Sequence, residues 1–292
     1  MLWLWERQLV GEGVSGSVVL YLKKSRPSEL YAVKEYCTKE KYESNEEYKD
    51  RVLHEYRVLK RLDHENFIKV FKYEISWTGV TIKVFMEAGF VNVKQIADKL
   101  QFEEALCLWR QLCEGVSYLH GQNYSHRDLK PENLILCAPQ GRLKIIDMMT
   151  ASECNEDAIG LVGSEPYCAP EMFSKLRYNG KKADVWSVGI ILYFLINNEL
   201  PWKSTHHSDP RFALYKSDSS SGDSKSKGAE SKILGRFPTE SRNLISHILT
   251  VNPDIRGSME SLYTDKWFNS ITFCGSSMCG ADHNLYLSAV PE

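Results

Sequence analysis

The sequence lacks any run of apolar residues long enough to cross a membrane, and its apolar start, residues 1–5, is too short for a secretory signal core. It also lacks a dominant charge, because 36 basic and 38 acidic residues leave a net charge of -2. No overall basic field therefore favours nucleic acid or an anionic membrane as the main partner. We expect a cytoplasmic protein with no nucleic-acid partner and no membrane insertion.

A disulfide framework and an internal repeat are absent as well. The eight cysteines are dispersed through segments that read as core strands and helices, which is typical of reduced thiols. Cys274 and Cys279 lie near His283, but the four-residue gap and the missing fourth ligand argue against a metal site. With 43% hydrophobic residues over 292 positions, the chain can build one two-lobed domain or two small ones.

The two halves of the chain show different periodicities. Residues 17–22, 30–37 and 79–85 have strand patterns, and a capping box at Ser44 and Glu47 begins a helix that carries Glu55 on its apolar stripe. Residues 102–120 and 183–195 have helical patterns instead. Residues 217–232 are rich in Ser, Gly, Asp and Lys, which predicts a mobile surface insertion.

The most informative stretch is His-Arg-Asp-Leu-Lys-Pro-Glu-Asn-Leu over residues 126–134. An ordinary solvated turn would also favour Asp, Lys and Asn. The stretch nevertheless resembles the catalytic loop of protein serine/threonine kinases. The resemblance implies that Asp128 accepts a hydrogen bond from the substrate hydroxyl, Lys130 neutralises the transferring phosphate, and Asn133 binds magnesium.

Residues 11–18 match the glycine-rich pattern G-x-G-x-x-G-x-V through Gly11, Gly13, Gly16 and Val18. A dinucleotide-binding turn shares the first six positions, but a helix would follow it, whereas residues 17–22 are β-prone. We therefore predict a glycine-rich hairpin over phosphates.

Lys34 lies on the next predicted strand, and the alternation of strand side chains puts it on the same face as Ala32. Many strand lysines are simply exposed. Glu55, however, is an available ion-pair partner that would orient Lys34 as a phosphate clamp.

Asp147 ends a buried strand and is followed by Met148 and Met149, which resembles the magnesium-binding Asp-Phe-Gly of kinases with two positions changed. Methionine at position 149 removes the free access to positive φ that glycine has there.

Later motifs follow in the family's order. Residues 163–171 resemble the end of an activation segment whose Glu171 would pair with Arg256, and Asp184 would accept backbone amides from the catalytic loop. Ser164 is expected to contact that loop. Arg127 is expected to gather a negative group: phosphorylated Thr150 or Ser152, or one of the acids Glu153, Glu156 and Asp157.

The resemblance covers about residues 7–270 and implies an α+β bilobal protein-kinase fold that binds ATP and Mg²⁺ in its cleft. The expected parts are a small β-rich N-lobe over 1–88, a larger helical C-lobe over 89–270 and a C-terminal tail over 271–292. The residues expected to bind the adenine are Val18, Ala32, Met86, Glu87, Gly89 and Ile135.

Residues 161–167, 201–203 and 208–212 are also similar to the fungal halotolerance and nitrogen-permease-reactivator kinases. This narrower resemblance implies protein substrates with Ser or Thr acceptors and regulation of plasma-membrane transporters. Two alternatives remain: a pseudokinase scaffold, impaired by the Asp-Met-Met motif, and a small-molecule kinase on the same fold.

Overall fold

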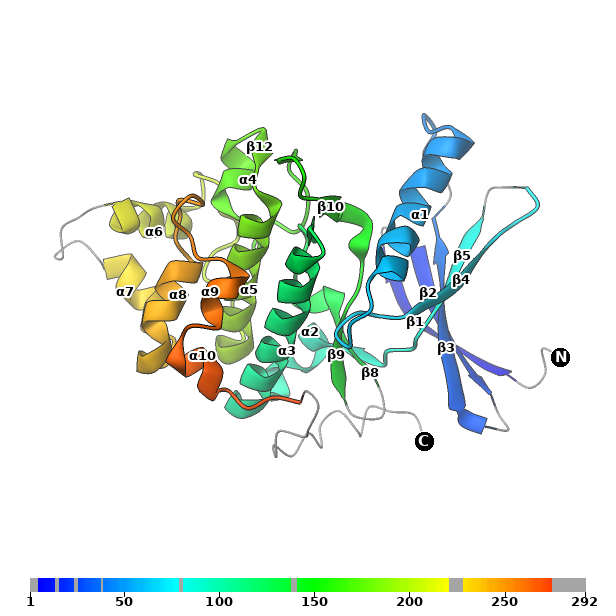
Figure 1. Cartoon of the computed structure of the whole chain (residues 1–292), viewed down its shortest axis with the longest axis horizontal. Helices are drawn as coiled ribbons and strands as arrows, with labels where there is room; N and C mark the ends of the chain where they lie inside the picture. The colour runs from blue at the N-terminus through cyan, green and yellow to red at the C-terminus, as the bar shows by residue number, and fades with distance from the viewer. Residues whose placement is uncertain are drawn as a thin grey trace. The chain divides into compact units, whose positions relative to one another are not determined.

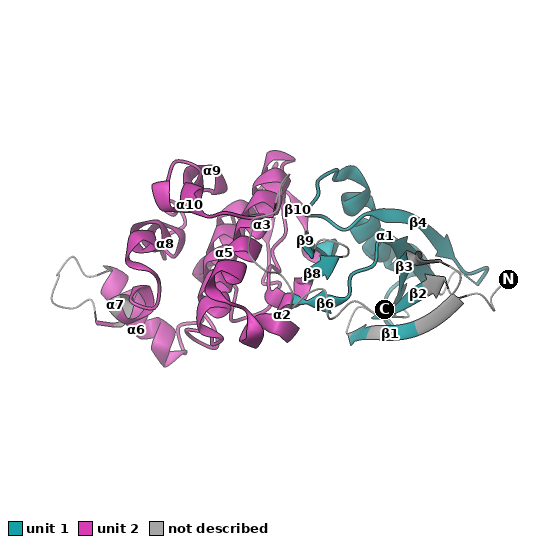
Figure 2. Cartoon of the chain, turned by 90° about the horizontal axis from the view of Figure 1, so that it is seen from below, with its two compact units in different colours: residues 1–92, 135–149, 284–292 teal, residues 93–134, 150–283 magenta. Residues whose placement is uncertain are grey.

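The computed structural model describes residues 5–13, 16–23, 26–37, 39–78, 81–137, 141–220 and 228–274 (Figure 1). The chain forms two compact units, shown in Figure 2. Among the described residues, unit 1 comprises those up to residue 92 together with 135–149, and unit 2 comprises 93–134 and 150–274. The first unit is rich in strands and the second in helices, which confirms the expected α+β class.

Unit 1 contains a five-stranded antiparallel sheet in the order β1-β2-β3-β5-β4. Its register places Val18 opposite Lys34, and Ala32 opposite Met86, so these four side chains share one face of the sheet. The glycine-rich segment is a hairpin, as predicted, because β1 and β2 pair antiparallel. The strands are β1 (Trp5–Gly13), β2 (Gly16–Lys23), β3 (Arg26–Tyr36), β4 (Val70–Ile75) and β5 (Ile82–Met86).

Helix α1 (Asn45–Arg61) is the long helix of unit 1 and begins at the predicted capping box. Ser44 Oγ accepts from the Glu47 amide, and Glu47 accepts from the Ser44 amide, so two exposed donors of the first turn are satisfied. Its apolar stripe is buried, and Glu55 is buried within that stripe. The sequence therefore places a carboxylate where only a paired charge is stable.

A second, three-stranded sheet of unit 1 has the order β6-β8-β9. The strands are β6 (Val91–Asn92), β8 (Leu134–Cys137) and β9 (Arg142–Ile145). Asn66 joins β9 to the segment after α1: its Nδ2 donates to the Leu143 carbonyl at 2.9 Å, and its carbonyl accepts from the Ile145 amide at 2.7 Å. Residues 135–149 therefore belong with the strand-rich unit although they follow the predicted C-lobe helices.

The core of unit 2 is formed by α3 (Phe102–Gly121) and α5 (Gly180–Asn197), which run side by side in Figure 1. Helix α5 is buried on nearly all sides, as an apolar helix inside a domain must be. The indole nitrogen of Trp109 on α3 donates to the Val188 carbonyl of α5 at 3.0 Å. These two helices form the framework from which the functional loops extend.

Shorter elements surround that core. The helices are α2 (Val93–Ile96), η2 (Ala97–Lys99), η3 (Pro131–Asn133), α4 (Pro170–Ser174), α6 (Pro210–Ser220), α7 (Gly228–Leu234), η5 (Thr239–Ser241), α8 (Arg242–Ile248), α9 (Met259–Leu262) and α10 (Lys266–Ser270). The short strands pair as β7 (Tyr124–Ser125) with β10 (Ser152–Glu153), and β11 (Ala158–Ile159) with β12 (Arg177–Tyr178). The turn η4 (Met148–Thr150) ends unit 1 and begins the activation segment.

The predicted insertion at 217–232 differs from the structure at its ends. Residues 217–220 belong to α6 and residues 228–232 to α7, whereas 221–227 lie outside the described residues. Helix α6 is held by buried Phe212 and by Tyr215, whose hydroxyl donates to the Leu249 carbonyl at 2.8 Å. Tertiary packing thus extends a helix into a segment whose polar composition predicts a loop.

The predicted lobe boundary after residue 88 and the tail over 271–292 stay predictions, and Cys279 and His283 lie outside the described residues. Among the helices that are described, none combines the length and apolar character needed to cross a bilayer.

Candidate active site

The catalytic-loop backbone is held by a buried carboxylate from α5. Asp184 is fully buried and accepts from the amides of His126 and Arg127, both at 2.8 Å, while His120 Nε2 lies 3.0 Å from its Oδ2. Arg127 has a positive φ of 67°, a strained conformation for a residue with a side chain. The predicted anchoring role of Asp184 is therefore present, and it stabilises a turn that would otherwise be unfavourable.

Among the described residues, one carboxylate oxygen of Asp128 is hydrogen-bonded and the other is buried without a partner. Asp128 Oδ2 accepts from Lys130 Nζ at 2.8 Å, and the side-chain Nδ2 of Asn133 donates to the Asp128 backbone carbonyl at 2.9 Å. Within the described residues, the buried Oδ1 has no hydrogen-bond partner. A buried acceptor without a partner is costly in a resting structure, and a substrate hydroxyl would satisfy it.

Gly163 lies close to this oxygen. Its φ is +87°, and a Cβ atom at this position would lie 2.4 Å from the Arg127 carbonyl oxygen and 3.3 Å from Asp128 Oδ1. The activation segment can therefore approach the catalytic loop this closely only with glycine. Next to it, Ser164 Oγ accepts from Lys130 Nζ at 2.8 Å, which confirms the expected contact of Ser164 with the loop.

The side-chain amide of Asn133 has one oxygen that can bind a hard cation. Its Nδ2 points to Asp128, so its Oδ1 is the atom that can bind a metal. Amide and carboxylate oxygens are the protein ligands that Mg²⁺ prefers. Asn133 in unit 2 has such an oxygen, and so has Asp147 in unit 1, so each residue taken by itself is of a type that fits the expected ion.

Arg127 does not pair with an acid among the described residues. Its Nε donates to the Thr150 carbonyl at 2.7 Å and its Nη1 to the Ile159 carbonyl at 3.2 Å. Thr150 Oγ1 in turn donates to the His126 carbonyl at 2.8 Å, and Glu153 accepts from the Tyr124 hydroxyl. The acid route therefore differs from the expectation, because the carbonyls of Thr150 in η4 and Ile159 in β11 accept from the guanidinium. The phosphorylation of Thr150 or Ser152 stays a prediction.

The activation segment ends at a second buried ion pair. Arg256 Nη1 and Nη2 donate to the two oxygens of Glu171 at 2.6 and 2.8 Å, in the bidentate geometry that favours arginine. The guanidinium also donates to the carbonyls of Thr250, Val251 and Lys182. The predicted pair is confirmed, and every donor group of Arg256 has a partner.

In unit 1, the expected ion pair between β3 and α1 is present. Lys34 Nζ lies 2.7 Å from Glu55 Oε2, and both side chains are buried. Burial by itself would lower the pKa of Lys34, but the charges of Glu55 and Asp147 reverse this effect and raise it above its usual value. Lys34 is therefore a fixed cation, as a phosphate clamp requires.

Asp147 adopts the positive φ in this turn, at 65°, and Met149 does not. Met149 lies in the 3-10 turn η4, and Met148 before it is fully buried. The concern that methionine at position 149 obstructs a left-handed conformation is therefore unfounded, because the residue that adopts this conformation is the acid itself. Aspartate tolerates it better than most side chains.

The residues expected around the adenine lie on two parts of unit 1. Val18, Ala32 and Met86 share the sheet face that carries Lys34. A Cβ atom on Gly89 would lie only 2.4 Å from Ile135 Cδ1, so the absence of a side chain at Gly89 lets Ile135 pack against its backbone.

Two further groups complete this part of unit 1. The backbone amide of Glu87 donates to the Lys69 carbonyl at 2.8 Å, and the Glu87 carboxylate lies 3.0 Å from Lys144 Nζ. The backbone groups that are candidates to bind an adenine edge are therefore the Glu87 carbonyl and the Gly89 amide. In the hairpin, Gly13 pairs with Gly16. A Cβ atom on Gly16 would lie 2.1 Å from the Glu35 carbonyl oxygen. Among the described residues, which exclude 14–15, nothing lies within 4 Å of a Cβ at Gly11.

Sequence reasoning missed two residues of the site. Tyr36 donates its hydroxyl to Glu55, and strand alternation could have found it because it lies two residues after Lys34. Gly163 was assigned only to a motif, since its approach to Asp128 depends on tertiary packing.

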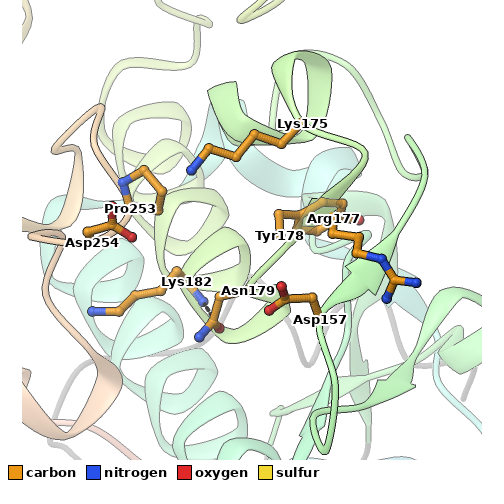
Figure 3. A pocket seen from close by; sticks show the side chains of 8 residues that line it. All are labelled: Asp157, Lys175, Arg177, Tyr178, Asn179, Lys182, Pro253 and Asp254. Atoms are coloured by element: carbon orange, nitrogen blue, oxygen red, sulfur yellow. Dashed lines mark hydrogen bonds between the residues drawn. The ribbon is translucent and has the colours of Figure 1, made fainter.

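A separate hollow of about 410 Å³ in unit 2 is lined by Asp157, Lys175, Arg177, Tyr178, Asn179, Lys182, Pro253 and Asp254 (Figure 3). Its charged side chains have both signs, and the Arg177 guanidinium points away from the others. Asn179 and Lys182 have structural tasks: Asn179 Oδ1 caps α5, and Lys182 Nζ donates to the Arg256 carbonyl. The lining contains no residue of the catalytic loop, so the hollow is distinct from the candidate active site.

Residues 5–268 match the protein kinase domain family, and the chain therefore belongs to it. The chain is 32% identical over 283 residues to the probable serine/threonine-protein kinase RTK1 of Saccharomyces cerevisiae, covering 91% of this chain and 44% of the relative. It is 29% identical over 309 residues to the nitrogen permease reactivator protein of the same yeast, covering 91% and 39%.

A third relative, the serine/threonine-protein kinase oca2 of Schizosaccharomyces pombe, is 28% identical over 319 residues, covering 91% of this chain and 48% of oca2. These matches confirm the narrower resemblance to the nitrogen-permease-reactivator group. The chain spans less than half the length of each of these relatives.

Proposed function

We propose that this protein is an ATP- and Mg²⁺-dependent kinase that transfers the γ-phosphate of ATP to serine or threonine hydroxyls of protein substrates. The observation that carries the proposal is the buried Oδ1 of Asp128, which has no hydrogen-bond partner among the described residues, beside a lysine that bridges Asp128 to Ser164. A carboxylate in this state can orient a hydroxyl and accept its proton. The family membership and the names of the relatives support the reaction class.

Each residue has a defined task in this reaction. Asp128 Oδ1 accepts the proton of the attacking hydroxyl, and the ammonium group of Lys130 offsets charge on the transferring group. Lys34, held by Glu55, binds phosphate oxygens. Asn133 and Asp147 would hold Mg²⁺, which supplies charge neutralisation to the phosphates.

The biological substrates that we propose are regulators of plasma-membrane transporters, or the transporters themselves, phosphorylated from the cytoplasmic side. The name of one relative, a nitrogen permease reactivator, supports this proposal. Phosphorylation of cytoplasmic segments of a permease by this chain would test it, with a Ser-to-Ala segment as the control.

The rival function is a pseudokinase scaffold, and it rests on the Asp-Met-Met motif. The backbone weakens this interpretation, because Asp147 and not Met149 adopts the left-handed conformation. A small-molecule kinase is disfavoured by the buried Glu171–Arg256 pair, which the family associates with the protein-substrate apparatus.

The test is incubation of the full chain with labelled ATP, Mg²⁺ and peptides that contain Ser, Thr or Tyr acceptors. We expect labelling of Ser or Thr peptides, and a fall of about 10²–10⁴-fold in kcat for Asp128→Asn, the usual contribution of a general base. Asp50→Asn is the matched control, because Asp50 is exposed on α1. A catalytic rate of Asp128→Asn within about threefold of the parent, a barrier change below 1 kcal/mol, would refute the role of Asp128.

Nucleotide binding separates the rivals. Thermal stabilisation by ATP should require Mg²⁺ if Asp147 and Asn133 share the phosphate charge with the metal. Equal stabilisation in excess chelator, without peptide labelling, would support the scaffold.

A further inference from the structure

Two side chains donate to a single buried carboxylate oxygen of Glu55 in unit 1. Glu55 Oε2 accepts from Lys34 Nζ at 2.7 Å and also from the hydroxyl of Tyr36. The three residues are 3%, 7% and 4% exposed, respectively. Lys34 and Tyr36 lie two residues apart on β3 and therefore on one face of the strand, while Glu55 comes from α1.

We propose that Tyr36 is a positioning residue that attaches Glu55 of α1 to β3 and thereby orients Lys34 for the nucleotide. This inference rests on the proposed kinase function. Without Tyr36, the helix carboxylate would be held to the strand by lysine alone, whose side chain has four rotatable bonds. Tyr36 supplies a second donor from a rigid ring with two side-chain torsions, so it restricts Glu55 at a lower entropy cost.

The environment keeps Tyr36 in the donor form. Burial, followed by the negative charge of Glu55, raises the pKa of Tyr36 well above its usual value, so its hydroxyl keeps its proton. The Tyr36 ring is also placed 4.8 Å from Lys34 Nζ, within the range of a cation–π contact. The tyrosine thus contacts both members of the ion pair, one through its oxygen and one through its ring.

The backbone at Tyr36 is fixed as well. A Cβ atom on Gly16 would lie 2.8 Å from Tyr36 Cα, so the start of β2 packs directly against this residue. Tyr36 therefore connects the glycine-rich hairpin, the clamp lysine and α1 within unit 1. A shift of α1 away from the sheet would have to break two hydrogen bonds to Glu55 rather than one.

Tyr36→Phe tests the proposal, because it keeps the ring and removes only the hydroxyl. We expect kcat/KM for MgATP to fall about tenfold, in the range of one hydrogen bond to a charged group, with KM for the peptide within twofold. Tyr31→Phe is the matched control: Tyr31 lies on the same strand but on the opposite face, stacked on Tyr21 at 5.2 Å. Its kcat/KM should stay within twofold of the parent.

A double-mutant cycle identifies the route of the effect. If Tyr36 acts through Glu55, Tyr36→Phe should add less than twofold in a Glu55→Gln background. Full multiplication of the two losses would overturn the proposal, as would a Tyr36→Phe enzyme within twofold of the parent. A peptide KM that rises as much as the KM for MgATP would also overturn it, because a general loss of structure has that signature.

Hydrogen exchange separates this inference from the proposed function. Amides of α1 over residues 45–61 should exchange at least threefold faster in Tyr36→Phe than in Tyr31→Phe, at equal melting temperatures of unit 2. If the parent phosphorylates no peptide, the proposed function fails, and the exchange experiment still tests the anchoring of α1. Unchanged exchange in Tyr36→Phe would refute it.

Discussion

Replacement of Glu171 by glutamine should destabilise unit 2 strongly, although the two side chains have nearly the same shape. Glu171 is 1% exposed and Arg256 is fully buried, and the two share a bidentate contact at 2.6 and 2.8 Å. Glutamine keeps one oxygen acceptor, places an amide donor against an arginine donor, and removes the compensating charge. Lysine cannot substitute for Arg256, because it lacks the planar fork.

The magnitude follows from burial. Removal of one partner of a buried ion pair typically costs about 3–5 kcal/mol, because the remaining charge is left buried without compensation. For a unit of this size, each kcal/mol corresponds to about 2–4 °C in melting temperature, so we expect a decrease of about 6–20 °C. The carbonyls of Thr250, Val251 and Lys182 continue to bind Arg256, which places the expected loss toward the lower end.

The assay is thermal and urea unfolding followed by tryptophan fluorescence, with Asp50→Asn as the control. Asp50 pairs with Arg57 at 2.9 Å, but these side chains are 78% and 52% exposed, so that loss should stay below about 1 kcal/mol. A Glu171→Gln protein that melts within 2 °C of Asp50→Asn would refute the reasoning, because it would mean that Arg256 needs no buried counter-charge.

Two other substitutions test the loops of the site. Gly163→Ala should lower peptide phosphorylation at least tenfold, because its Cβ would press on the Arg127 carbonyl and approach Asp128 Oδ1. The control is Gly160→Ala, which has a similar φ of +78° and no described atom within 4 Å of its Cβ. Its free energy of unfolding should fall by the strain of about 1–2 kcal/mol, without that loss of activity. Met149→Gly should lower the free energy of unfolding by about 1 kcal/mol and speed conformational exchange, since φ at Met149 is not positive. A more stable variant would contradict the conclusion that methionine is unstrained at this position.

Features that depend on a few neighbouring residues could be predicted from the sequence. The capping box of α1 formed as expected, because its donors and acceptors are three residues apart. The hairpin of the glycine-rich segment followed from β-prone residues after Gly16. The pairs Lys34–Glu55 and Glu171–Arg256 were predictable because each motif has a defined place in the family fold.

Several decisive features depended on contacts between distant segments. Strand alternation could have identified Tyr36, but only the packing of α1 on the sheet shows that its hydroxyl reaches Glu55. The two carbonyls that satisfy Arg127 come from residues 23 and 32 positions away, and no local pattern encodes that pairing. Composition also predicted a loop at the end of α6, where the buried ring of Tyr215 extends the helix.

The sequence by itself determined which chemical groups are present, in which order, and on which face of each helix or strand. Side-chain periodicity and short capping contacts act within a few residues, so a linear pattern encodes them. The tertiary structure alone decided the backbone conformation at Asp147 and, among the described residues, left the buried Oδ1 of Asp128 without a partner beside Gly163. These properties depend on atoms brought together by packing, where a shift of less than 1 Å decides whether a contact exists.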